Sequence, residues 1–330
     1  MKIVALDGYT KGVTDNPWDE VAALGDLAVH DRTAPEEVIP RCREADIVLT
    51  DAVALPAETI AALPGLRLIC VMAAGYDGVD VAEAGRRGIP VVNAPGYGPW
   101  SVAQFAIALL LELCHRVGLH DEAVKGGEWR ACPDYCFWKS PQVELHGKVF
   151  GVVGFGNIGS RAARMAHGLG MEVIAYTPRP KPAPDFAPFA FVDLPDLFSR
   201  ADVVSLHCPL TAENRGFLGE ALLSRMKPTA FLVNTARGKL VVEADLAAAL
   251  NGGRIAGAAL DVVSVEPIRP DNPLLSARNC LITPHIAWST LEARRRLMHL
   301  TAENIRAWLA GSPVNVVNRA WLDAPGGARD

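Results

Sequence analysis

Short apolar runs alternate along this chain with longer stretches that have the periodicity of amphipathic helices. A first series of apolar runs lies at residues 3–6, 47–49, 66–72 and 91–92. The helical stretches between them lie at 35–45, 56–63 and 81–87. A second series of apolar runs begins at 148 and continues at 203–206, 231–233, 258–262 and 281–283. Such alternation is typical of parallel strands covered by helices on both faces, so we predict an α/β protein with two doubly wound parallel sheets.

The boundary between the two units is predicted at the proline- and glycine-rich stretch 95–99. A long apolar helix over 101–116, capped by Ser101, should follow it. The last helical stretch, 290–309, comes after the final strand of the second series, and we expect it to return to the first unit. Residues 1–98 and 288–330 would then form one discontinuous domain, and residues 99–287 would form the other.

The segment near 118–147 belongs to neither predicted sheet and is rich in aromatic residues: Trp129, Tyr135, Phe137 and Trp138. If these side chains are exposed, they form a sizeable apolar patch. Two interpretations stay open. The segment is either a loop folded on its own domain or an arm that contacts a second copy of the chain in a homodimer.

Composition is that of an ordinary globular protein. The chain has 330 residues, of which 50% are hydrophobic, which is enough for two cores. The net charge of −5 and the lack of a basic stripe argue against a nucleic-acid partner. The most apolar helical run, 103–114, is too short to span a bilayer, and the first residues enter a strand without the sections of a signal peptide. We therefore expect a cytoplasmic protein without a membrane partner.

The seven cysteines are scattered, with no C-x-x-C pair and no histidine cluster at metal-ligand spacing. Cys132 and Cys136 lie nearest each other, but one such spacing does not make a zinc site. This pattern predicts reduced core thiols and no bound metal.

The strongest chemical signal is a glycine motif placed between an apolar strand and a helix, Gly154-Phe155-Gly156-Asn157-Ile158-Gly159. Gly154 permits the tight turn, Gly156 has no side chain to hold a pyrophosphate away, and Gly159 lets the helix pack closely on the strand. The start of the helix, with Asn157 and Ile158, presents unpaired N–H groups to the phosphates. The motif predicts a nicotinamide dinucleotide cofactor.

The end of the next strand bears on which dinucleotide binds. NAD sites place an acidic residue about 20 positions beyond the glycines, where it binds the ribose 2′-hydroxyl. Here Thr177 stands at that position, and Arg179 and Lys181 follow it. Thr177 can hydrogen-bond a 2′-phosphate and Arg179 can pair with its charge, so NADP(H) is favoured and NAD(H) is possible. Alternatively, Arg179 and Lys181 are only solvated loop charges.

Three polar residues follow strands of the second series: Arg237, Glu266 and His285. Ligands of open α/β sheets bind at the carboxyl ends of the strands. Taken singly, each residue has a structural explanation, as an ion-pair, a turn or a buried polar residue. Together they suit the reduction of a 2-keto acid, because a guanidinium binds a carboxylate, an imidazole transfers a proton near neutral pH, and a carboxylate fixes the imidazole tautomer.

Several ordered segments, spread over essentially the whole length, resemble the D-isomer-specific 2-hydroxyacid dehydrogenase family. Besides the glycine motif they are Ala73-Ala74-Gly75-Tyr76-Asp77-Gly78-Val79-Asp80, Asn234-Thr235-Ala236-Arg237-Gly238, Leu260-Asp261-Val262, Glu266-Pro267 and Thr283-Pro284-His285-Ile286-Ala287. The resemblance implies a flavodoxin-like substrate domain and a Rossmann cofactor domain. The chain departs from the family pattern at Thr177, which replaces the usual acidic residue, and at Gln104, where relatives often have Glu.

The resemblance also implies a role for each residue in the reaction. Arg237 would bind the substrate carboxylate and polarise the keto oxygen, His285 would donate the proton, and Glu266 would orient and charge His285. Backbone N–H groups of Ala74 and Gly75 would hold the carboxylate from the first domain, so that domain closure completes the site.

Further residues are implied to contact the cofactor. Asp261 would bind the nicotinamide carboxamide. The other expected contacts come from Pro209, Thr235, Ala236 and His285.

Within the family, Cys136-Phe137-Trp138 and residues 285–290 resemble the glycerate dehydrogenase, or hydroxypyruvate reductase, branch. That branch implies hydroxypyruvate or glyoxylate as the substrate, with Trp138 of one subunit against the substrate pocket of the other. Pyruvate, a phenylpyruvate-like acid or phosphoglycerate are alternative substrates. Glu266 argues against the formate dehydrogenase branch, which has Gln beside its His. A nicotinamide-sensing protein similar to a co-repressor is disfavoured, because no long disordered or basic extension is visible.

Overall fold

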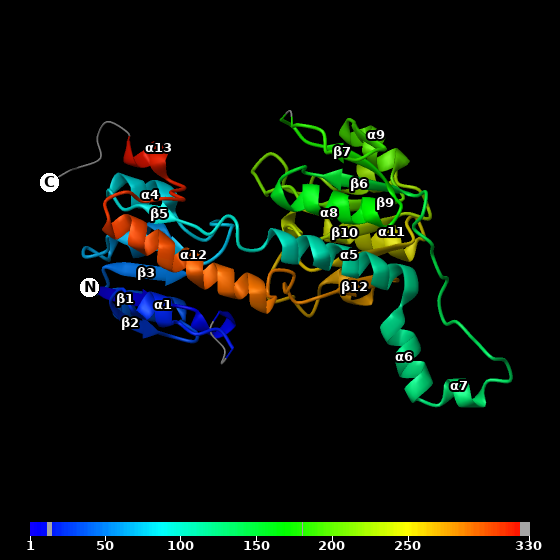
Figure 1. Ribbon diagram of the computed structural model, residues 1–330, viewed down its shortest axis with the longest axis horizontal. Helices are drawn as coiled ribbons and strands as arrows, with labels where there is room; N and C mark the ends of the chain where they lie inside the picture. Colours follow the sequence, from blue (N-terminus) through cyan, green and yellow to red (C-terminus); the bar gives the residue numbers. More distant parts are fainter. Residues whose placement is uncertain (12–14, 180, 324–330) are drawn as a thin grey trace. The chain divides into compact units, whose positions relative to one another are not determined.

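The computed structural model describes residues 1–11, 15–179 and 181–323. Its contacts divide the chain into two compact units, Met1–Gly98 with Ser289–Asp330, and Pro99–Trp288. Figure 1 shows the elements of both units.

The first unit is a five-stranded parallel sheet in the order β2-β1-β3-β4-β5. This is the flavodoxin-like order, as predicted. The strands are β1 (Lys2–Ala5), β2 (Asp26–Val29), β3 (Ile47–Thr50), β4 (Leu68–Val71) and β5 (Val91–Val92). The helices are α1 (Asp19–Ala22), α2 (Val38–Cys42), α3 (Ala57–Ala61), α4 (Val81–Arg86), α12 (Leu291–Leu309) and α13 (Arg319–Leu322), with 3-10 turns η1 (Gly8–Thr10) and η2 (Pro35–Glu37).

The second unit is a seven-stranded parallel sheet in the order β12-β11-β10-β9-β6-β7-β8. The strands are β6 (Val149–Val153), β7 (Glu172–Tyr176), β8 (Phe189–Phe191), β9 (Val203–Leu206), β10 (Phe231–Asn234), β11 (Gly257–Leu260) and β12 (Cys280–Ile282). The helices are α5 (Pro99–His115), α6 (Val117–Lys125), α7 (Glu128–Ala131), α8 (Asn157–Gly168), α9 (Leu194–Arg200), α10 (Glu220–Leu223) and α11 (Glu243–Asn251), with 3-10 turns η3 (Gly238–Leu240) and η4 (Pro273–Ser276). The order reverses between β6 and β9, as in a Rossmann sheet, which confirms the predicted fold class.

Two apolar cores cover the faces of this sheet. On one face Phe150 and Val152 pack with residues of α5 and α8, which lie side by side in Figure 1. On the other face Val153 packs with residues of α9 and α11. Successive residues of β6 thus point into opposite cores, which is why the strand has no polar position.

Helix α5 begins at Pro99, so the prediction that Ser101 caps it is wrong. Proline suits the first helical position, because the N–H that it lacks would have no partner there. Ser101 lies inside the first turn, and its hydroxyl donates to the Ala287 carbonyl oxygen at 2.6 Å. The helix ends at His115, and Arg116 follows in a left-handed conformation with φ of 48°.

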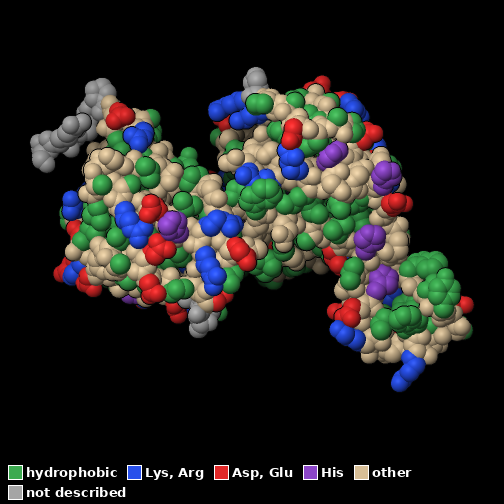
Figure 2. Space-filling model, in the orientation of Figure 1, with side chains coloured by type: hydrophobic (Ala, Val, Ile, Leu, Met, Phe, Trp, Pro, Cys, Tyr) green, Lys and Arg blue, Asp and Glu red, His purple; other side chains and the backbone are tan. Residues whose placement is uncertain are grey.

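Helices α6 and α7 project away from the sheet of their unit, and the irregular segment after them returns to it, where Val143 and Leu145 pack on the core (Figure 1). We call residues 117–147 the arm. Figure 2 shows hydrophobic side chains gathered on this arm. Tyr135 is 89% exposed and Trp138 is 70% exposed. The arm therefore carries an exposed apolar patch. A loop folded on its own domain, the first of the two interpretations, would have buried these side chains.

Among the described residues, no single helix is long and apolar enough to cross a membrane. Helices α5 and α6 reach the required length and apolar composition only as a pair, and the pair is bent by 55°.

All seven cysteines are free thiols, but they are not all in the core. Cys42, Cys70 and Cys114 are buried, whereas Cys136, on the arm, is exposed. Cys132, Cys208 and Cys280 are partly exposed. The expectation of core thiols fails for Cys136 because its segment packs on neither sheet.

Candidate active site

Three neighbouring strands bring the predicted catalytic residues to one edge of the sheet. In the registers of β10, β11 and β12, Asn234 lies beside Leu260 and Leu260 beside Ile282. Arg237, Glu266 and His285 each follow the end of one of these strands. Since parallel strands all end at the same edge, the three loops share the carboxyl side of the sheet.

His285 and Glu266 form a direct pair. Nδ1 of His285 lies 2.6 Å from Oε2 of Glu266, and the other carboxylate oxygen accepts the Val263 N–H at 3.1 Å. The hydrogen bond to Glu266 raises the pKa of His285 against the opposing effect of burial, and the negative charge of Glu266 adds to the increase. Burial opposes ionisation of Glu266, but the hydrogen bond and charge of His285 hold the pKa of that carboxyl below its usual range.

The loop that carries His285 is held by Asp261. This carboxylate is 1% exposed and accepts hydrogen bonds from the Thr283 hydroxyl (2.6 Å) and the N–H groups of Ile286 (2.9 Å) and Ala287 (2.8 Å). Burial raises the pKa of Asp261 although these bonds oppose the increase. His285 itself has φ of 55°, and its N–H donates to the carbonyl oxygen of Asp261 at 2.9 Å. Asp261 thus fixes the backbone from which the imidazole projects.

The loop that carries Arg237 is held by Asn234, which is fully buried. Its side-chain amide donates to the Arg237 carbonyl oxygen and its oxygen accepts the Ala236 N–H, both at 3.0 Å. The guanidinium donates to the Ala236 carbonyl oxygen at 2.8 Å. The charge of Arg237 is also among the minor influences that lower the pKa values of Glu266 and His285, so the structure brings the three predicted catalytic residues together.

Gly238 sets how closely the Arg237 and Glu266 loops approach. A Cβ atom on Gly238 would lie 1.9 Å from the carbonyl carbon of Val263 and 2.5 Å from the Ser264 nitrogen. Only glycine permits this contact between the two backbones. From the other side, Glu243 of α11 accepts the N–H and hydroxyl of Ser264 at 2.6 and 2.7 Å.

Asn234, Gly238 and Glu243 were not assigned roles from the sequence. Asn234 and Gly238 flank Arg237 in a motif that already signalled the site, so their positions could have suggested support for its loop. Glu243 gave no such signal, because an acidic residue in the first turn of a helix is ordinary.

The glycine turn has the shape that a dinucleotide needs. Gly154 has φ of 99°, and a Cβ there would lie 2.6 Å from the Cys208 nitrogen. A Cβ on Gly159 would lie 2.1 Å from the Gly154 carbonyl oxygen, whereas one on Gly156 would meet nothing within 4 Å. The tight turn, the open approach and the close helix contact thus fall at the predicted glycines.

Helix α8 starts at Asn157, and neither Asn157 nor Ile158 places an acidic group in its first turn. Its unpaired N–H groups therefore remain suited to an anion. Thr235 Oγ1, at the end of β10, is buried without a partner among the described residues, as expected where a ligand supplies one. These features fit a nicotinamide dinucleotide, which supplies or accepts the hydride when bound.

The remaining predicted cofactor residues lie on loops at the same edge. Gly154 donates its N–H to the Tyr176 carbonyl oxygen at 2.8 Å, so the half-buried Thr177 begins beside the glycine turn. Arg179 is exposed two residues further on. Pro209 follows β9 and is exposed, and Ala236 follows β10 and is half-buried.

Ala74 and Gly75 follow β4 in the first unit. Neither N–H donates a hydrogen bond to another of the residues that the structure describes. The Ala74 carbonyl oxygen accepts the Asn93 amide at 2.7 Å, which fixes this turn. Two free N–H groups at a strand end suit a carboxylate.

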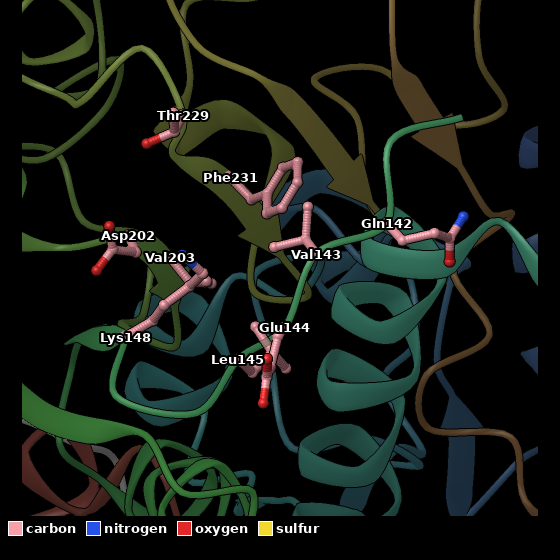
Figure 3. Close-up of a pocket in the computed structure, with 9 residues that line it drawn as sticks. All are labelled: Gln142, Val143, Glu144, Leu145, Lys148, Asp202, Val203, Thr229 and Phe231. Atoms are coloured by element: carbon pink, nitrogen blue, oxygen red, sulfur yellow. The ribbon is translucent and has the colours of Figure 1, made fainter. Parts of the chain in front are cut away.

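The second unit also contains a cavity of about 280 Å³. Figure 3 shows the residues that line it. Lys148, Asp202 and Phe231 line it at or next to the first residues of β6, β9 and β10, with the segment 142–145 across it. It therefore lies at the amino ends of the strands, opposite the edge that carries Arg237 and His285.

The comparisons with known proteins agree with this geometry. Residues 107–287 match the family model of the D-isomer specific 2-hydroxyacid dehydrogenase NAD-binding domain. A hydroxypyruvate reductase of Blautia hydrogenotrophica is 48% identical over 97% of this chain and 100% of its own length. A glycerate dehydrogenase of Methylorubrum extorquens is 37% identical over 86% of this chain and 88% of its own.

Among solved structures, an NADPH-dependent glyoxylate/hydroxypyruvate reductase from Sinorhizobium meliloti, in complex with NADP and malonate, has a TM-score of 0.84. It is 29% identical, and the match covers 97% of each chain. The matched family domain, the nearly full-length relatives and the paired His285 and Glu266 lead to one conclusion: this chain belongs to the D-isomer-specific 2-hydroxyacid dehydrogenase family and is a nicotinamide-dependent oxidoreductase.

Proposed function

We propose that the protein reduces hydroxypyruvate to D-glycerate, or glyoxylate to glycolate, with NADPH favoured as the hydride donor. The observation that carries this proposal is the pairing of His285 with Glu266 at 2.6 Å. Nδ1 of the imidazole is committed to the carboxylate, so Nε2 is the ring nitrogen that faces a substrate. A protein that only senses a dinucleotide would have no need of this pair.

Each side chain then has one task. The Arg237 guanidinium binds the carboxylate of the 2-keto acid and polarises its keto oxygen. Protonated His285 donates its Nε2 proton to that oxygen as the alcohol forms. Glu266 stabilises the protonated imidazole.

The substrate assignment is supported by the relatives. The relative from Blautia hydrogenotrophica is named a hydroxypyruvate reductase, and three further relatives are named glyoxylate reductases from Korarchaeum cryptofilum, Aeropyrum pernix and Thermofilum pendens. Both acids are small and carry the carboxylate that Arg237 would bind.

The cofactor preference is supported by the end of β7. Thr177 leaves room and a hydroxyl where an acidic residue would repel a 2′-phosphate, and the exposed Arg179 offers a positive charge beside it. The similar structure from Sinorhizobium meliloti is NADPH-dependent by its own description.

We also propose that the protein is a two-fold symmetric homodimer, in which the arm 117–147 of one subunit covers the other. The support is the exposed apolar surface of the arm, since such a surface is costly in water. Trp138, 70% exposed, would then reach the partner's substrate pocket.

The direct test follows oxidation of NADPH and NADH in parallel across a panel of 2-keto acids. The panel contains hydroxypyruvate, glyoxylate, pyruvate, phenylpyruvate and a phosphorylated acid. The proposal expects the highest kcat/KM with hydroxypyruvate or glyoxylate and NADPH. A wide preference for NADH would contradict the interpretation of Thr177 and Arg179, and a preference for a larger or phosphorylated acid would contradict the substrate.

A further inference from the structure

A half-buried histidine, His207, lies beside the glycine turn, and its Nδ1 atom is fully shielded from solvent. His207 follows β9, which lies between β6 and β10 in the sheet. Leu206 is paired with Val153 of β6 and Asn234 of β10. The next residues of the three strands are therefore His207, Gly154 and Thr235, side by side at the carboxyl edge.

The close approach of Gly154 confirms this arrangement. A Cβ on Gly154 would lie 2.8 Å from the backbone carbonyl carbon of His207. His207 thus stands between the turn that suits the pyrophosphate and the loop that carries Arg237.

The imidazole is held on one side only. Nε2 lies 2.8 Å from the Ser205 hydroxyl, whereas Nδ1 is buried and has no partner among the described residues. Thr235 Oγ1, on the neighbouring strand, is likewise buried without a partner. Buried polar atoms are nearly always hydrogen-bonded in native proteins, so two orphans at adjacent strand ends point to a ligand that pairs with them.

The Ser205 hydroxyl sets which ring nitrogen carries the proton. Ser205 is fully buried and has no other hydrogen-bond partner in the described chain. If Nε2 carried the proton, both the hydroxyl hydrogen and the bare Nδ1 atom would lack partners. If the hydroxyl donates to Nε2, only the Nδ1–H remains unpaired. Burial lowers the pKa of His207 to about 4, so the ring is neutral near pH 7.

We propose that His207 is a cofactor-positioning residue, whose Nδ1–H donates a hydrogen bond to an oxygen of the bound dinucleotide, with Ser205 fixing the tautomer. Because β9 lies between the glycine turn and the Arg237 loop, the acceptor belongs to the part of the cofactor between the pyrophosphate and the nicotinamide, either a phosphate or a ribose oxygen. The proposal rests on dinucleotide binding at this edge.

Two variants of His207 separate the two ring nitrogens. Asparagine places an amide N–H at about the distance of Nδ1 from the backbone, whereas glutamine reaches the position of Nε2 and leaves Nδ1 empty. The purified full chain is titrated with NADPH in a calorimeter, and the thermal midpoint of the cofactor-free protein is measured in parallel. We expect His207→Gln to raise Kd about tenfold or more, and His207→Asn to stay within about threefold of the parent.

Ser205→Ala tests the tautomer. Without the hydroxyl, either ring nitrogen can carry the proton, so the affinity for NADPH should fall a few-fold. In a protein that already carries His207→Gln, adding Ser205→Ala should cause no further loss of affinity. ADP-ribose then locates the acceptor: a loss with ADP-ribose and not with ADP assigns the ribose, and a loss with both assigns a phosphate.

Unchanged NADPH affinity in His207→Gln would overturn the proposal. Equal losses in the Asn and Gln variants, with a lower thermal midpoint in both, would also overturn it, because the residue would then be structural. Failure of the parent protein to bind either NADPH or NADH would refute the cofactor assignment and this inference with it, whereas normal binding without turnover would refute only the proposed reaction.

Discussion

His285 holds its proton to a higher pH than a free imidazole because Glu266 accepts the hydrogen bond from its Nδ1 atom at 2.6 Å. The pKa of His285 is raised by this bond against the effect of burial. Reduction needs the protonated ring, so the reductive activity should persist up to the raised pKa and decline above it. The reverse reaction needs the neutral ring and should follow the opposite pH dependence.

Glu266→Gln tests this pair. Glutamine keeps a hydrogen-bond acceptor but removes the negative charge, so the pKa of His285 should fall and the alkaline limb of the reductive pH profile should move to lower pH. At neutral pH we expect a loss of about tenfold, milder than the 10²- to 10⁴-fold typical for loss of a general acid. The pH dependence of kcat/KM measures it, and an unmoved limb would separate Glu266 from the protonation of His285.

Arg237→Lys tests the carboxylate contact. Lysine keeps the charge but cannot form two parallel hydrogen bonds, so kcat/KM should fall roughly tenfold to a hundredfold. Steady-state kinetics with hydroxypyruvate check this expectation. Near-normal values would mean that Arg237 does not contact the substrate.

The placement of the three polar residues was the most predictable part of the site. Arg237, Glu266 and His285 each follow a strand, and parallel strands end at one edge, so the sequence was enough to expect them together. The lack of a partner for Nδ1 of His207 among the described residues was not predictable, because it depends on which atoms lie beside this nitrogen in the folded sheet. For the same reason the contact between Gly238 and the Val263 backbone was visible only in the structure.

Among the elements, the two loops after β10 and β11 depend on each other through Gly238. Gly238→Ala would place a Cβ 1.9 Å from the Val263 carbonyl carbon, so one loop must move. We expect the free energy of unfolding to fall by about 1–3 kcal/mol. We also expect kcat/KM to fall by more than the loss of folded protein alone would cause, since Arg237 and Glu266 shift apart. Denaturant unfolding and kinetics measure the two effects.

Gly168→Ala is the matched control for this substitution. Gly168 is exposed at the end of α8, and a Cβ there would meet nothing within 4 Å. Its stability should be unchanged or raised by up to about 1 kcal/mol. A Gly238→Ala protein as stable and active as this control would show that the loops do not require the close contact.

Most strands were predictable, including the edge strands β5 and β12, whereas the edge strands β2 and β8 were not. The predicted run 203–206 is β9, all of whose residues are buried. Strands β2 and β8 lie at sheet edges, and most of their residues are exposed. Strand β2 has the sequence Asp-Leu-Ala-Val and β8 has Phe-Ala-Phe, and apolar runs this short do not distinguish an exposed edge strand from a loop.

At the scale of the whole molecule, the arm 117–147 predicts a dimer in which Trp138 contributes to the partner's site. Trp138→Ala should raise KM or weaken the preference for small keto acids, without a change in NADPH affinity, because the ring would border the substrate and not the cofactor. Trp129→Ala is the matched control, since Trp129 is also exposed on the arm but its indole N–H is bonded to the Tyr135 carbonyl oxygen at 3.0 Å.

Light scattering coupled to gel filtration measures the oligomer directly. The proposed arm contact requires a mass of two chains for the parent protein. An active monomer would refute the dimer, and unchanged substrate selectivity in Trp138→Ala would make the arm purely structural. The sequence could not decide this point, because an aromatic loop and an aromatic arm have the same composition.

The central claim is that His285 transfers the proton in a nicotinamide-dependent reduction of a small 2-keto acid. The most direct measurement compares NADPH oxidation with hydroxypyruvate, and NADPH Kd by titration, in the parent protein and in His285→Gln. Glutamine can hydrogen-bond the keto oxygen but cannot protonate it, so we predict a fall of about 10²- to 10⁴-fold in kcat with a nearly unchanged Kd. A variant that turns over hydroxypyruvate at close to the parent rate would contradict the claim.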